Sequence, residues 1–342
     1  MSTADSTQQK LLELLSGKWV TAALSTAAEL GLADALSDRS LSATELATHL
    51  QCDREALQRL LRVLCGEQLL RSESQGRYAL TELGAQLKTG NLRELARFVG
   101  AEFMWHPWAK LADAMRDPSK SAFERATGHS LFDHLDRVPA DAKLYHRAVD
   151  AFTRAAAHAL CETFDFSELD TVVDLGGGLG TVLTELTARF PHLEGILFDR
   201  PQVIKQADSL FADHPQRDRI QLHSGDFFEQ VPQNADAYVI KHVLHNWDDQ
   251  QAQRILRLCA QALKPTGQVL IVESLLLPGD QRDATAFLDL EMLALCGQGH
   301  ERSKPAFRQL LQQAGLSLRT TTKLVGDVRL LVAVPRTPPT NL

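Results

Sequence analysis

The chain has 342 residues, 44% of them apolar and 23% charged, and its formal net charge is -7 at pH 7. This composition indicates a globular protein of about two domains, and the negative charge argues against general attraction to nucleic acid or an anionic membrane. The 5 cysteines are scattered, which argues against a disulfide framework and a structural zinc site. We expect a cytoplasmic location without membrane contact, because the sequence shows neither a secretion leader nor a long apolar run.

The first hundred residues predict a small, mostly helical domain. Apolar residues recur every three or four positions at its start, and Ser42 to Glu45 form a capping box. The expected elements are helices over 8–36, 43–50 and 54–66, followed by a hairpin of strands 69–71 and 77–80. Helix, turn, helix and hairpin in this order describe a winged helix, which binds DNA in some proteins and is a scaffold or dimerisation domain in others.

Charge argues against the DNA-binding interpretation of this domain. Residues 41–100 carry 8 basic and 7 acidic side chains, a net charge of 8 - 7 = +1. Asp53 and Glu55 also lie at the start of the second helix, where base contacts would be made. We therefore favour a dimerisation or scaffold role and keep a ligand-sensing DNA-binding regulator as an alternative.

Residues 101–165 form an expected helical connector with many aromatic side chains. Trp105 and Phe152 belong to this group. Core packing is the simpler explanation for any one ring, but together the rings could line an apolar pocket for a flat substrate. The predicted domains are thus 1–100 for dimerisation, 101–165 for the connector and 166–342 for catalysis.

The stretch from Thr171 to Arg200 predicts a strand, a glycine turn, a helix and a second strand. Its glycines, Gly176, Gly178 and Gly180, depart from the dinucleotide fingerprint. Asp174 places a negative charge where a pyrophosphate would lie, which favours a positively charged ligand such as S-adenosylmethionine. Asp199, about 20 residues later, can hydrogen-bond a ribose diol.

The rest of the chain predicts further alternation of strands and helices. Expected strands cover 220–223, 237–241 and 268–272, a turn covers 264–267, a last helix spans 305–313, and two final strands lie near 320 and 330. This alternation is typical of an α/β, Rossmann-like, doubly wound parallel sheet. The carboxyl ends of its strands then bring five side chains to one rim: Asp199, Asp226, Lys241, His245 and Glu273.

His245 is the candidate general base at this rim. An imidazole can accept the proton of a phenol as the phenol oxygen attacks a methyl group, and Glu273 and Glu301 are carboxylates able to hold the ring. Asp226 and Phe227 could meet an adenine amino group and ring face. A metal site is the rival interpretation, but His242 and His245 lack a nearby carboxylate pattern that completes one, and we expect no metal.

Six segments together carry a resemblance to a known family. They are VVDLGGGLG, ILFDRPQVI, SGDFF, KHVLHNW, LKPTGQVLIVES and DLEMLALCGQGHERS. In this order they resemble the S-adenosylmethionine-dependent small-molecule O-methyltransferases of the plant caffeic acid type and their bacterial natural-product relatives. The resemblance covers nearly the whole chain.

The resemblance implies an N-terminal winged-helix-like domain that forms an intertwined homodimer and a class I methyltransferase domain. It implies cofactor contacts at Gly176, Asp199, Asp226, Phe227 and Lys241. It makes His245 the base, with Glu273 and Glu301 as flanking carboxylates, and it places Met292 in the substrate pocket. The expected reaction is methylation of an aromatic hydroxyl, with S-adenosylhomocysteine as the second product.

Three positions depart from the family pattern. Cys296 replaces an asparagine that touches the substrate in plant members, Val149 replaces a methionine that packs on the acceptor ring, and His300 adds an imidazole beside Glu301. These changes argue against plant phenylpropanoid substrates and favour a bacterial secondary metabolite such as a phenazine, polyketide or phenol. N-methylation, or decarboxylation or hydroxylation with the cofactor retained, remain alternatives.

Overall fold

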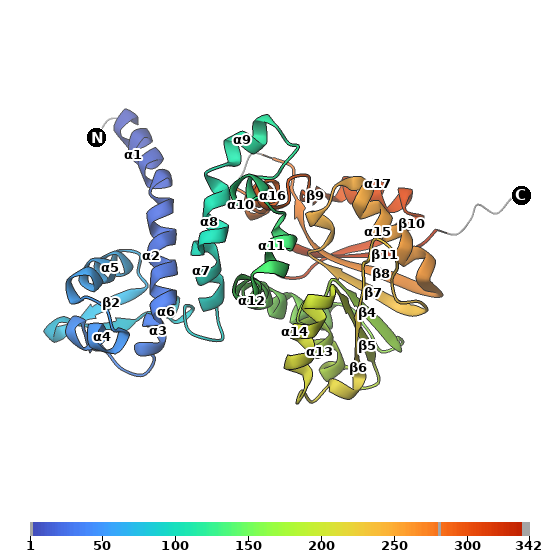
Figure 1. Ribbon diagram of the computed structural model, residues 1–342, viewed down its shortest axis with the longest axis horizontal. Coiled ribbons are helices and arrows are strands. Elements are labelled where there is room, and N and C mark those ends of the chain that lie inside the picture. Colours follow the sequence, from blue (N-terminus) through green and yellow to red (C-terminus); the bar gives the residue numbers. More distant parts are fainter. Residues whose placement is uncertain (1–2, 280–281, 337–342) are drawn as a thin grey trace, which may run out of the picture. The chain divides into compact units, whose positions relative to one another are not determined.

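The computed structural model describes residues 3–279 and 282–336 (Figure 1). The chain divides into two compact units, the first made of Met1–His106 with Pro139–Ala151 and the second of Pro107–Val138 with Phe152–Leu342. Two helices, α8 (Glu102–Trp108) and α12 (Pro139–Thr163), contribute residues to both units. The functional boundaries at residues 100 and 165 stay a prediction.

The first unit confirms the helix, turn, helix and hairpin pattern. Ser42 and Glu45 form the predicted capping box, in which the Ser42 N–H donates to the Glu45 carboxylate at 2.7 Å. A two-residue strand, β1, pairs with β3 and makes the hairpin a three-stranded sheet that the sequence pattern did not predict. The elements are α1 (Thr3–Leu15), α2 (Gly17–Leu30), α3 (Leu32–Ala35), β1 (Leu41–Ser42), α4 (Ala43–Leu50), α5 (Arg54–Gly66), β2 (Leu70–Glu73), η1 (Ser74–Gly76), β3 (Arg77–Leu80), α6 (Glu82–Ala85) and α7 (Arg93–Gly100).

The second unit is built on one large mixed sheet with the strand order β10-β11-β8-β7-β4-β5-β6. Five neighbouring strands are parallel, and β11 and β10 complete the sheet as antiparallel strands. The strands are β4 (Thr171–Leu175), β5 (Glu194–Asp199), β6 (Ile220–Ser224), β7 (Ala235–Lys241), β8 (Leu263–Leu276), β9 (Arg302–Ser303), β10 (Leu316–Lys323) and β11 (Val328–Pro335). This topology confirms the predicted doubly wound sheet.

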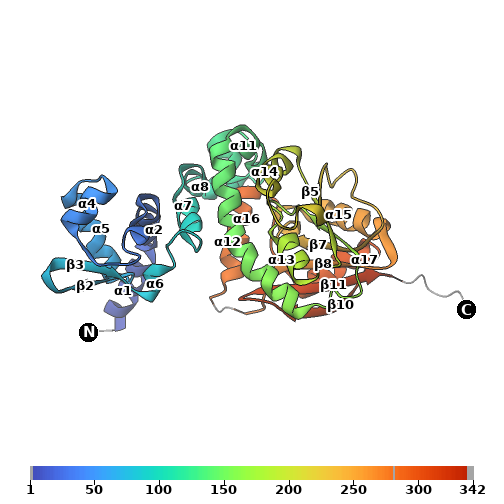
Figure 2. The same ribbon diagram turned by 90° about the horizontal axis from the view of Figure 1, so that it is seen from below.

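Helices cover both faces of that sheet because its strands are apolar on both sides. On one face, α15 and α17 pack against alternate strand residues such as Tyr238 and Ile240, and on the other, α12, α13 and α14 pack against Ala237 and Val239. Figure 2 shows α12 running alongside α13. The helices are α9 (Leu111–Arg116), α10 (Ala122–Thr127), α11 (Leu131–Arg137), α13 (Thr181–Arg189), α14 (Pro201–Phe211), η2 (Arg217–Arg219), η3 (Leu244–Asn246), α15 (Asp249–Ala262), α16 (Ala284–Cys296) and α17 (Lys304–Gln313).

Two local predictions need correction. The expected turn over 264–267 lies inside β8, which pairs with β7 at Leu263 and again from Gln268, so these four residues form an irregularity within a continuous strand. The strand also continues past Val272 to Leu276, where its end pairs with β9. Helix α16 and strand β9 were not predicted. Among the described residues, no helix combines the length and the apolarity that a membrane-spanning segment needs.

The chain order places the carboxyl ends of β4, β5 and β7 at a topological switch point. From β4 the chain moves to β5 and β6 on one side and then returns to β7 and β8 on the other. The connections that follow β4 and β7 therefore run in opposite directions. In open α/β sheets such a switch point leaves a crevice at the carboxyl ends of the strands, and ligands bind in that crevice. The candidate site lies there.

Candidate active site

The glycine turn between β4 and α13 adopts a backbone that favours glycine. Gly176 and Gly178 have φ angles of 70° and 60°, in the left-handed region. A Cβ on Gly176 would lie 2.8 Å from Val243, so this residue must be glycine for the turn to approach the segment that carries His245. A Cβ on Gly178 would meet no atom within 4 Å, and the Gly178 N–H donates to Asp199 at 2.9 Å.

Asp199 ends β5 and ties this turn to the neighbouring strand. Its carboxylate accepts hydrogen bonds from the Gly178 N–H and, at 2.7 Å, from the N–H of Arg200. The backbone carbonyl of Asp199 accepts from Gly225, at the start of the segment with Asp226 and Phe227. The ring of Phe227 borders Gly176, 3.7 Å from the position of an added Cβ, whereas Asp226 is exposed. Four of the predicted cofactor residues thus lie around one turn.

Asp174 is buried directly beneath the turn, with 1% of its surface exposed. Its Oδ2 atom has no hydrogen-bond partner among the described residues. Burial raises the pKa of Asp174 to about 7, and the positive charge of Lys241, at the end of β7, opposes that rise. An unpartnered buried carboxylate is costly, so this position favours a cationic ligand at the turn.

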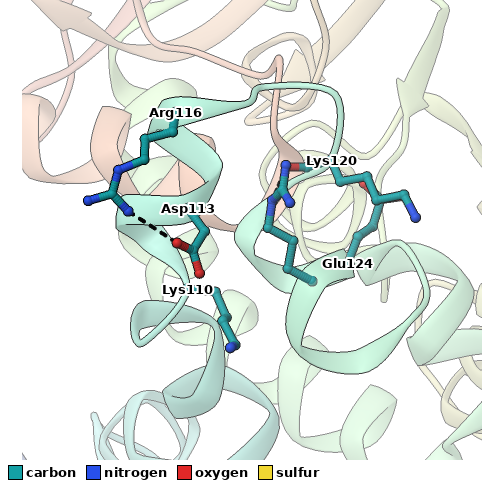
Figure 3. Close-up of a pocket in the computed structure, with 6 residues that line it drawn as sticks. Lys110, Asp113, Arg116, Lys120 and Glu124 are labelled. Carbon is teal, nitrogen blue, oxygen red and sulfur yellow. Dashed lines mark hydrogen bonds and ion pairs between the residues drawn. The ribbon is translucent and has the colours of Figure 1, made fainter.

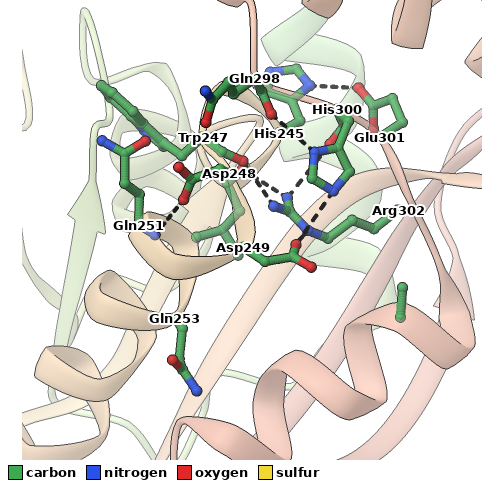
Figure 4. A network of polar contacts seen from close by, with 12 residues as sticks. His245, Trp247, Asp248, Asp249, Gln251, Gln253, Gln298, His300, Glu301 and Arg302 are labelled. Atoms are coloured by element: carbon green, nitrogen blue, oxygen red, sulfur yellow. Dashed lines mark hydrogen bonds and ion pairs between the residues drawn. The ribbon is translucent and has the colours of Figure 1, made fainter.

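His245 lies in the 3₁₀ turn η3 that follows β7, and 7% of its surface is exposed. Its Nδ1 atom lies 2.6 Å from Oε1 of Glu301 (Figure 4). The same atom lies 3.7 Å from Oε2 of Glu273. The structure therefore brings the three predicted catalytic side chains together. When Nδ1 carries the ring proton, Nε2 keeps a lone pair, which is the arrangement that a general base requires.

Glu273 also holds the backbone of the same turn. Its Oε1 atom accepts hydrogen bonds from the N–H groups of Val243, Leu244 and His245 at 3.1, 3.0 and 3.4 Å. Glu273 has no exposed surface, and β8 fixes its backbone within the sheet. One carboxylate oxygen thus positions the turn while the other faces the imidazole.

Burial shifts the pKa of all three groups in the direction that favours the uncharged form. It lowers the pKa of His245 below 6.5, while the charge of Glu273 opposes this change. It raises the pKa of Glu273 to about 7 and that of Glu301 to about 8, the latter helped by nearby Asp289. His245 is therefore neutral near pH 7, and its protonated form would have two carboxyl groups beside it.

Arg302 completes the support of the His245 turn and was missed in the sequence analysis. It is 2% exposed, and its guanidinium donates to the carbonyl oxygens of Leu244 at 2.9 Å and Trp247 at 2.8 Å (Figure 4). Its Nε donates to Asp249 at 2.8 Å, and His300 lies 3.3 Å from the same carboxylate oxygen. The turn is thus held through its N–H groups by Glu273 and through its carbonyls by Arg302.

Helix α16 carries two of the predicted pocket residues. Met292 is buried, and the Cys296 thiol lies 3.6 Å from the side-chain oxygen of Asn246, next to His245. Phe152, on α12, is 53% exposed. Trp105 on α8 and Val149 on α12 belong to the first compact unit and are partly buried. The role of these five side chains in a substrate pocket stays a prediction.

The His245 cluster also has the composition of a metal site, since one ligand atom from each of its three residues lies within 4.8 Å of the others. Tetrahedral zinc ligands roughly 2.1 Å from the metal lie roughly 3.4 Å apart. The 2.6 Å between His245 and Glu301 is instead a hydrogen-bond distance. Because Glu273 Oε1 already accepts backbone N–H groups, we interpret the cluster as a hydrogen-bonded one.

A pocket of about 560 Å³ lies between α9 and α10 (Figure 3). Its lining is charged, and Arg116 donates to Asp113 at 3.2 Å. The lining residues are Lys110, Asp113, Arg116, Lys120, Glu124 and Arg125. None of the predicted catalytic or cofactor residues lines this cavity, so we place the chemistry at His245.

Comparisons with known proteins agree with this geometry. A model of the O-methyltransferase domain matches residues 108–317, and a model of the O-methyltransferase dimerisation domain matches residues 12–90. The chain is 36% identical to the 3-amino-4-hydroxybenzoate 4-O-methyltransferase of Streptomyces cremeus over 340 residues, which covers 97% of this chain and 91% of that protein.

The fold of this chain is also similar to solved structures of O-methyltransferases. The mitomycin 7-O-methyltransferase MmcR superposes with a TM-score of 0.88 at 33% identity, over 97% of this chain and 99% of that one. The O-methyltransferase NcsB1 of neocarzinostatin biosynthesis superposes with a TM-score of 0.78 at 29% identity, over 93% and 96% of the two chains. NcsB1 was solved in complex with S-adenosylmethionine and 2-hydroxy-5-methyl naphthoic acid.

Proposed function

The chain belongs to the O-methyltransferase family, and we propose that it methylates a hydroxyl group of an aromatic small molecule with His245 as the general base. The observation that carries this proposal is the 2.6 Å contact between His245 Nδ1 and Glu301. It orients the imidazole in a buried site whose pKa shift keeps the ring neutral, as proton abstraction from a phenol requires.

The residues at the switch point fit S-adenosylmethionine as the methyl donor. The unpartnered Asp174 Oδ2 suits a cationic ligand, and the open side of Gly178 leaves room for one. Asp199 would hold the ribose hydroxyls, and Asp226 with Phe227 would hold the adenine. Bound there, S-adenosylmethionine would supply the methyl group, so that its methyl–sulfur bond breaks, an oxygen–methyl bond forms and S-adenosylhomocysteine remains.

The residues of this chain would act on the proton of the acceptor. His245 Nε2 would accept the hydroxyl proton as the oxygen–methyl bond forms, and Glu301 and Glu273 would stabilise the resulting imidazolium. A positioned base of this kind contributes about 10² to 10⁴ in rate, and alignment of the reacting atoms can contribute more. Release of the proton to solvent would restore neutral His245.

We infer that the acceptor is an aromatic metabolite of the natural-product type. The relatives named above act on an aminohydroxybenzoate and on mitomycin, and the NcsB1 complex holds a hydroxynaphthoic acid. The Streptomyces cremeus enzyme is bacterial and NcsB1 belongs to neocarzinostatin biosynthesis, which agrees with the departures from the plant pattern at Cys296 and Val149. Phenazines, polyketides and simple phenols all remain candidates.

A homodimer is the proposed assembly. The dimerisation-domain match covers residues 12–90, and the helices at its start leave large apolar side chains in solvent. Leu12, Leu15 and Trp19 are 53%, 66% and 72% exposed. A monomeric soluble protein rarely exposes a contiguous apolar face of this kind, whereas a second copy would bury it.

The reaction can be tested with methyl-labelled S-adenosylmethionine and 3-amino-4-hydroxybenzoate, which offers both oxygen and nitrogen to the enzyme. We expect the label on the hydroxyl oxygen, identified by NMR of the product, and unchanged activity after dialysis against EDTA. Label on the amino nitrogen would favour the N-methyltransferase alternative. Absence of methylation across a wider panel of phenols, phenazines and hydroxynaphthoic acids would contradict the proposal.

A further inference from the structure

The ring of His242 lies against the ring of His245, on the segment that follows β7. The two ring centroids are 5.2 Å apart and the ring planes meet at 24°, which is a stacked arrangement. Centroid distances of about 4.5 to 7 Å are typical of aromatic rings in contact. His242 therefore meets His245 with a flat face, whereas Glu301 meets it at the single atom Nδ1.

The backbone of His242 is held in an uncommon conformation. Its φ angle is 50°, in the left-handed region that few residues other than glycine adopt. Its N–H donates to the carbonyl of Val272 at 3.1 Å, and its own carbonyl accepts from the side-chain amide of Asn246 at 3.4 Å. Because both backbone groups have partners, the position from which the His242 ring projects is fixed.

The side chain of His242 also carries an unfavourable group. Its Nε2 atom is buried and has no hydrogen-bond partner in the described part of the chain. A left-handed residue other than glycine and an unpaired buried nitrogen each cost stability, and such features cluster at functional sites. Burial, helped by the charge of Lys241, lowers the pKa of His242 well below its usual value. The ring is therefore neutral near pH 7.

A stacked neutral ring supplies what the other supports of His245 lack. The hydrogen bond to Glu301 fixes one atom of the imidazole, and the ring can still tilt about that atom. A flat ring against its face restricts the tilt and so fixes the direction of the Nε2 lone pair. A neutral neighbour also adds no positive charge that would oppose formation of the imidazolium.

We propose that His242 is a positioning residue, whose stacked ring fixes the plane of the His245 imidazole and aims its Nε2 atom at the acceptor hydroxyl. The proposal rests on the proposed function, because it takes His245 to be the base. It makes the flat face of His242, and not its nitrogen atoms, the feature on which the rate depends. Loss of that face should lower the rate roughly 10- to 100-fold, since small misplacements of a catalytic group have effects of this size.

Three substitutions of His242 in the full-length protein separate the flat face from the nitrogen atoms and from simple filling of space. His242→Phe keeps a flat ring without nitrogen, His242→Leu fills the space without a flat face, and His242→Ala removes the ring. His214→Ala is the matched control, because the His214 ring has an aromatic contact of the same centroid distance, 5.2 Å to Phe211.

The first measurement is the single-turnover rate of methyl transfer at saturating S-adenosylmethionine, with the phenol that the wild-type enzyme methylates fastest. His242→Phe and His214→Ala should keep most of the wild-type rate, while His242→Leu and His242→Ala should lose it. The Kd of S-adenosylmethionine should stay unchanged in all four variants. A general disturbance of the fold would instead weaken cofactor binding together with the rate.

The second measurement needs no acceptor. In protein labelled with ¹⁵N-histidine, the proton that His245 Nδ1 shares with Glu301 gives an NMR signal, which is identified by its absence from His245→Ala. The wild type, His242→Phe and His214→Ala should show this signal sharp and at the same position. His242→Leu and His242→Ala should show it broadened or shifted, because the imidazole is then free to tilt.

Three results would overturn the role of His242 and leave methyl transfer intact: a wild-type rate in His242→Ala, an unchanged Nδ1 signal in that variant, or a rate in His242→Phe as low as in His242→Ala. If His242→Ala does not fold, the comparison of His242→Leu with His242→Phe decides. If no phenol is methylated but the Nδ1 signal depends on His242 as expected, the proposed function falls and the positioning of His245 stands.

Discussion

The guanidinium of Arg302 donates to the carbonyl oxygen of Leu244 at 2.9 Å, one residue before His245 in the chain. Because Glu301 contacts the imidazole itself, two consecutive residues hold the ring and the backbone of the same turn. This relationship makes the position of His245 depend on a segment more than 50 residues away, and it leads to the first prediction.

Arg302→Met should leave the Leu244 and Trp247 carbonyls without their buried donor and let the His245 turn shift. We expect kcat to fall about 10- to 100-fold, since small misplacements of a catalytic group have effects of this size, with little change in the Kd of S-adenosylmethionine. Arg302→Lys should restore part of kcat. Arg217→Met, at an exposed arginine near β6, is the control, and equal losses in both variants would refute a positioning role.

Gly178→Ala should weaken cofactor binding more than it destabilises the fold. Its φ of 60° is unfavourable for alanine, at about 1 to 2 kcal/mol, but an added Cβ meets no protein atom within 4 Å. Gly76, with a φ of 67° and equally open surroundings, is a matched control in the first unit. We expect similar losses of Tm in both variants, and a Kd for S-adenosylmethionine on the order of tenfold higher only in Gly178→Ala. Equal affinities would contradict a cofactor contact at Gly178.

Asp174→Asn should become increasingly stable relative to the wild type as the pH rises from 4 to 7. The folded-state pKa of Asp174 is raised to about 7, so the wild-type protein binds a proton there that the unfolded chain has released, and it loses stability over this interval. The variant avoids that loss, which amounts to at most about 4 kcal/mol.

The measurement for Asp174 is Tm without ligand across this pH interval, together with the Kd of S-adenosylmethionine at pH 7. The variant should bind the cofactor more weakly, because it lacks the negative charge. Two results would contradict this role of Asp174: a stability difference between variant and wild type that does not depend on pH, or an unchanged affinity for S-adenosylmethionine.

Glu273→Gln should change the acid side of the pH profile of kcat/KM. In the wild type we expect activity to fall as the pH drops through about 7, where the Glu273 carboxylate becomes protonated. The variant has no such group, so the part of the fall near pH 7 should disappear, while the titrations of Glu301, whose pKa burial raises to about 8, and of His245, whose pKa burial lowers, remain. The maximal kcat/KM of the variant should be roughly 10- to 100-fold lower than that of the wild type, because the imidazolium loses a stabilising charge. An unchanged pH profile would exclude Glu273 from the reaction.

Much of the fold was predictable because its signals are local. The glycine turn, the strand ending at Asp199 and the capping box at Ser42 each depend on a few neighbouring residues, and the structure has them as expected. Helix α16 was missed because it is apolar on nearly all sides and therefore lacks helical periodicity. The turn over 264–267 was wrong because pairing of β8 with β7 overrides the preference of a Pro and a Gly for a turn.

The sequence indicated which side chains meet at the candidate site, but it did not indicate the hydrogen bonds that hold their backbone in place. Strand ends bring His245 and Glu273 to one rim in any doubly wound sheet, so their proximity follows from topology. The partners of Arg302 are backbone carbonyls, which every residue has, so no pattern in the sequence marks them.

The most direct test of the account is the pair of measurements on His245→Ala: the Kd of S-adenosylmethionine by calorimetry and the single-turnover rate of methyl transfer to a phenol. His245 lies beyond the glycine turn that would hold the cofactor, so the Kd should stay within about twofold of the wild type, while the rate should fall by about 10² to 10⁴. A variant that binds the cofactor normally and transfers methyl at the wild-type rate would contradict His245 as the base.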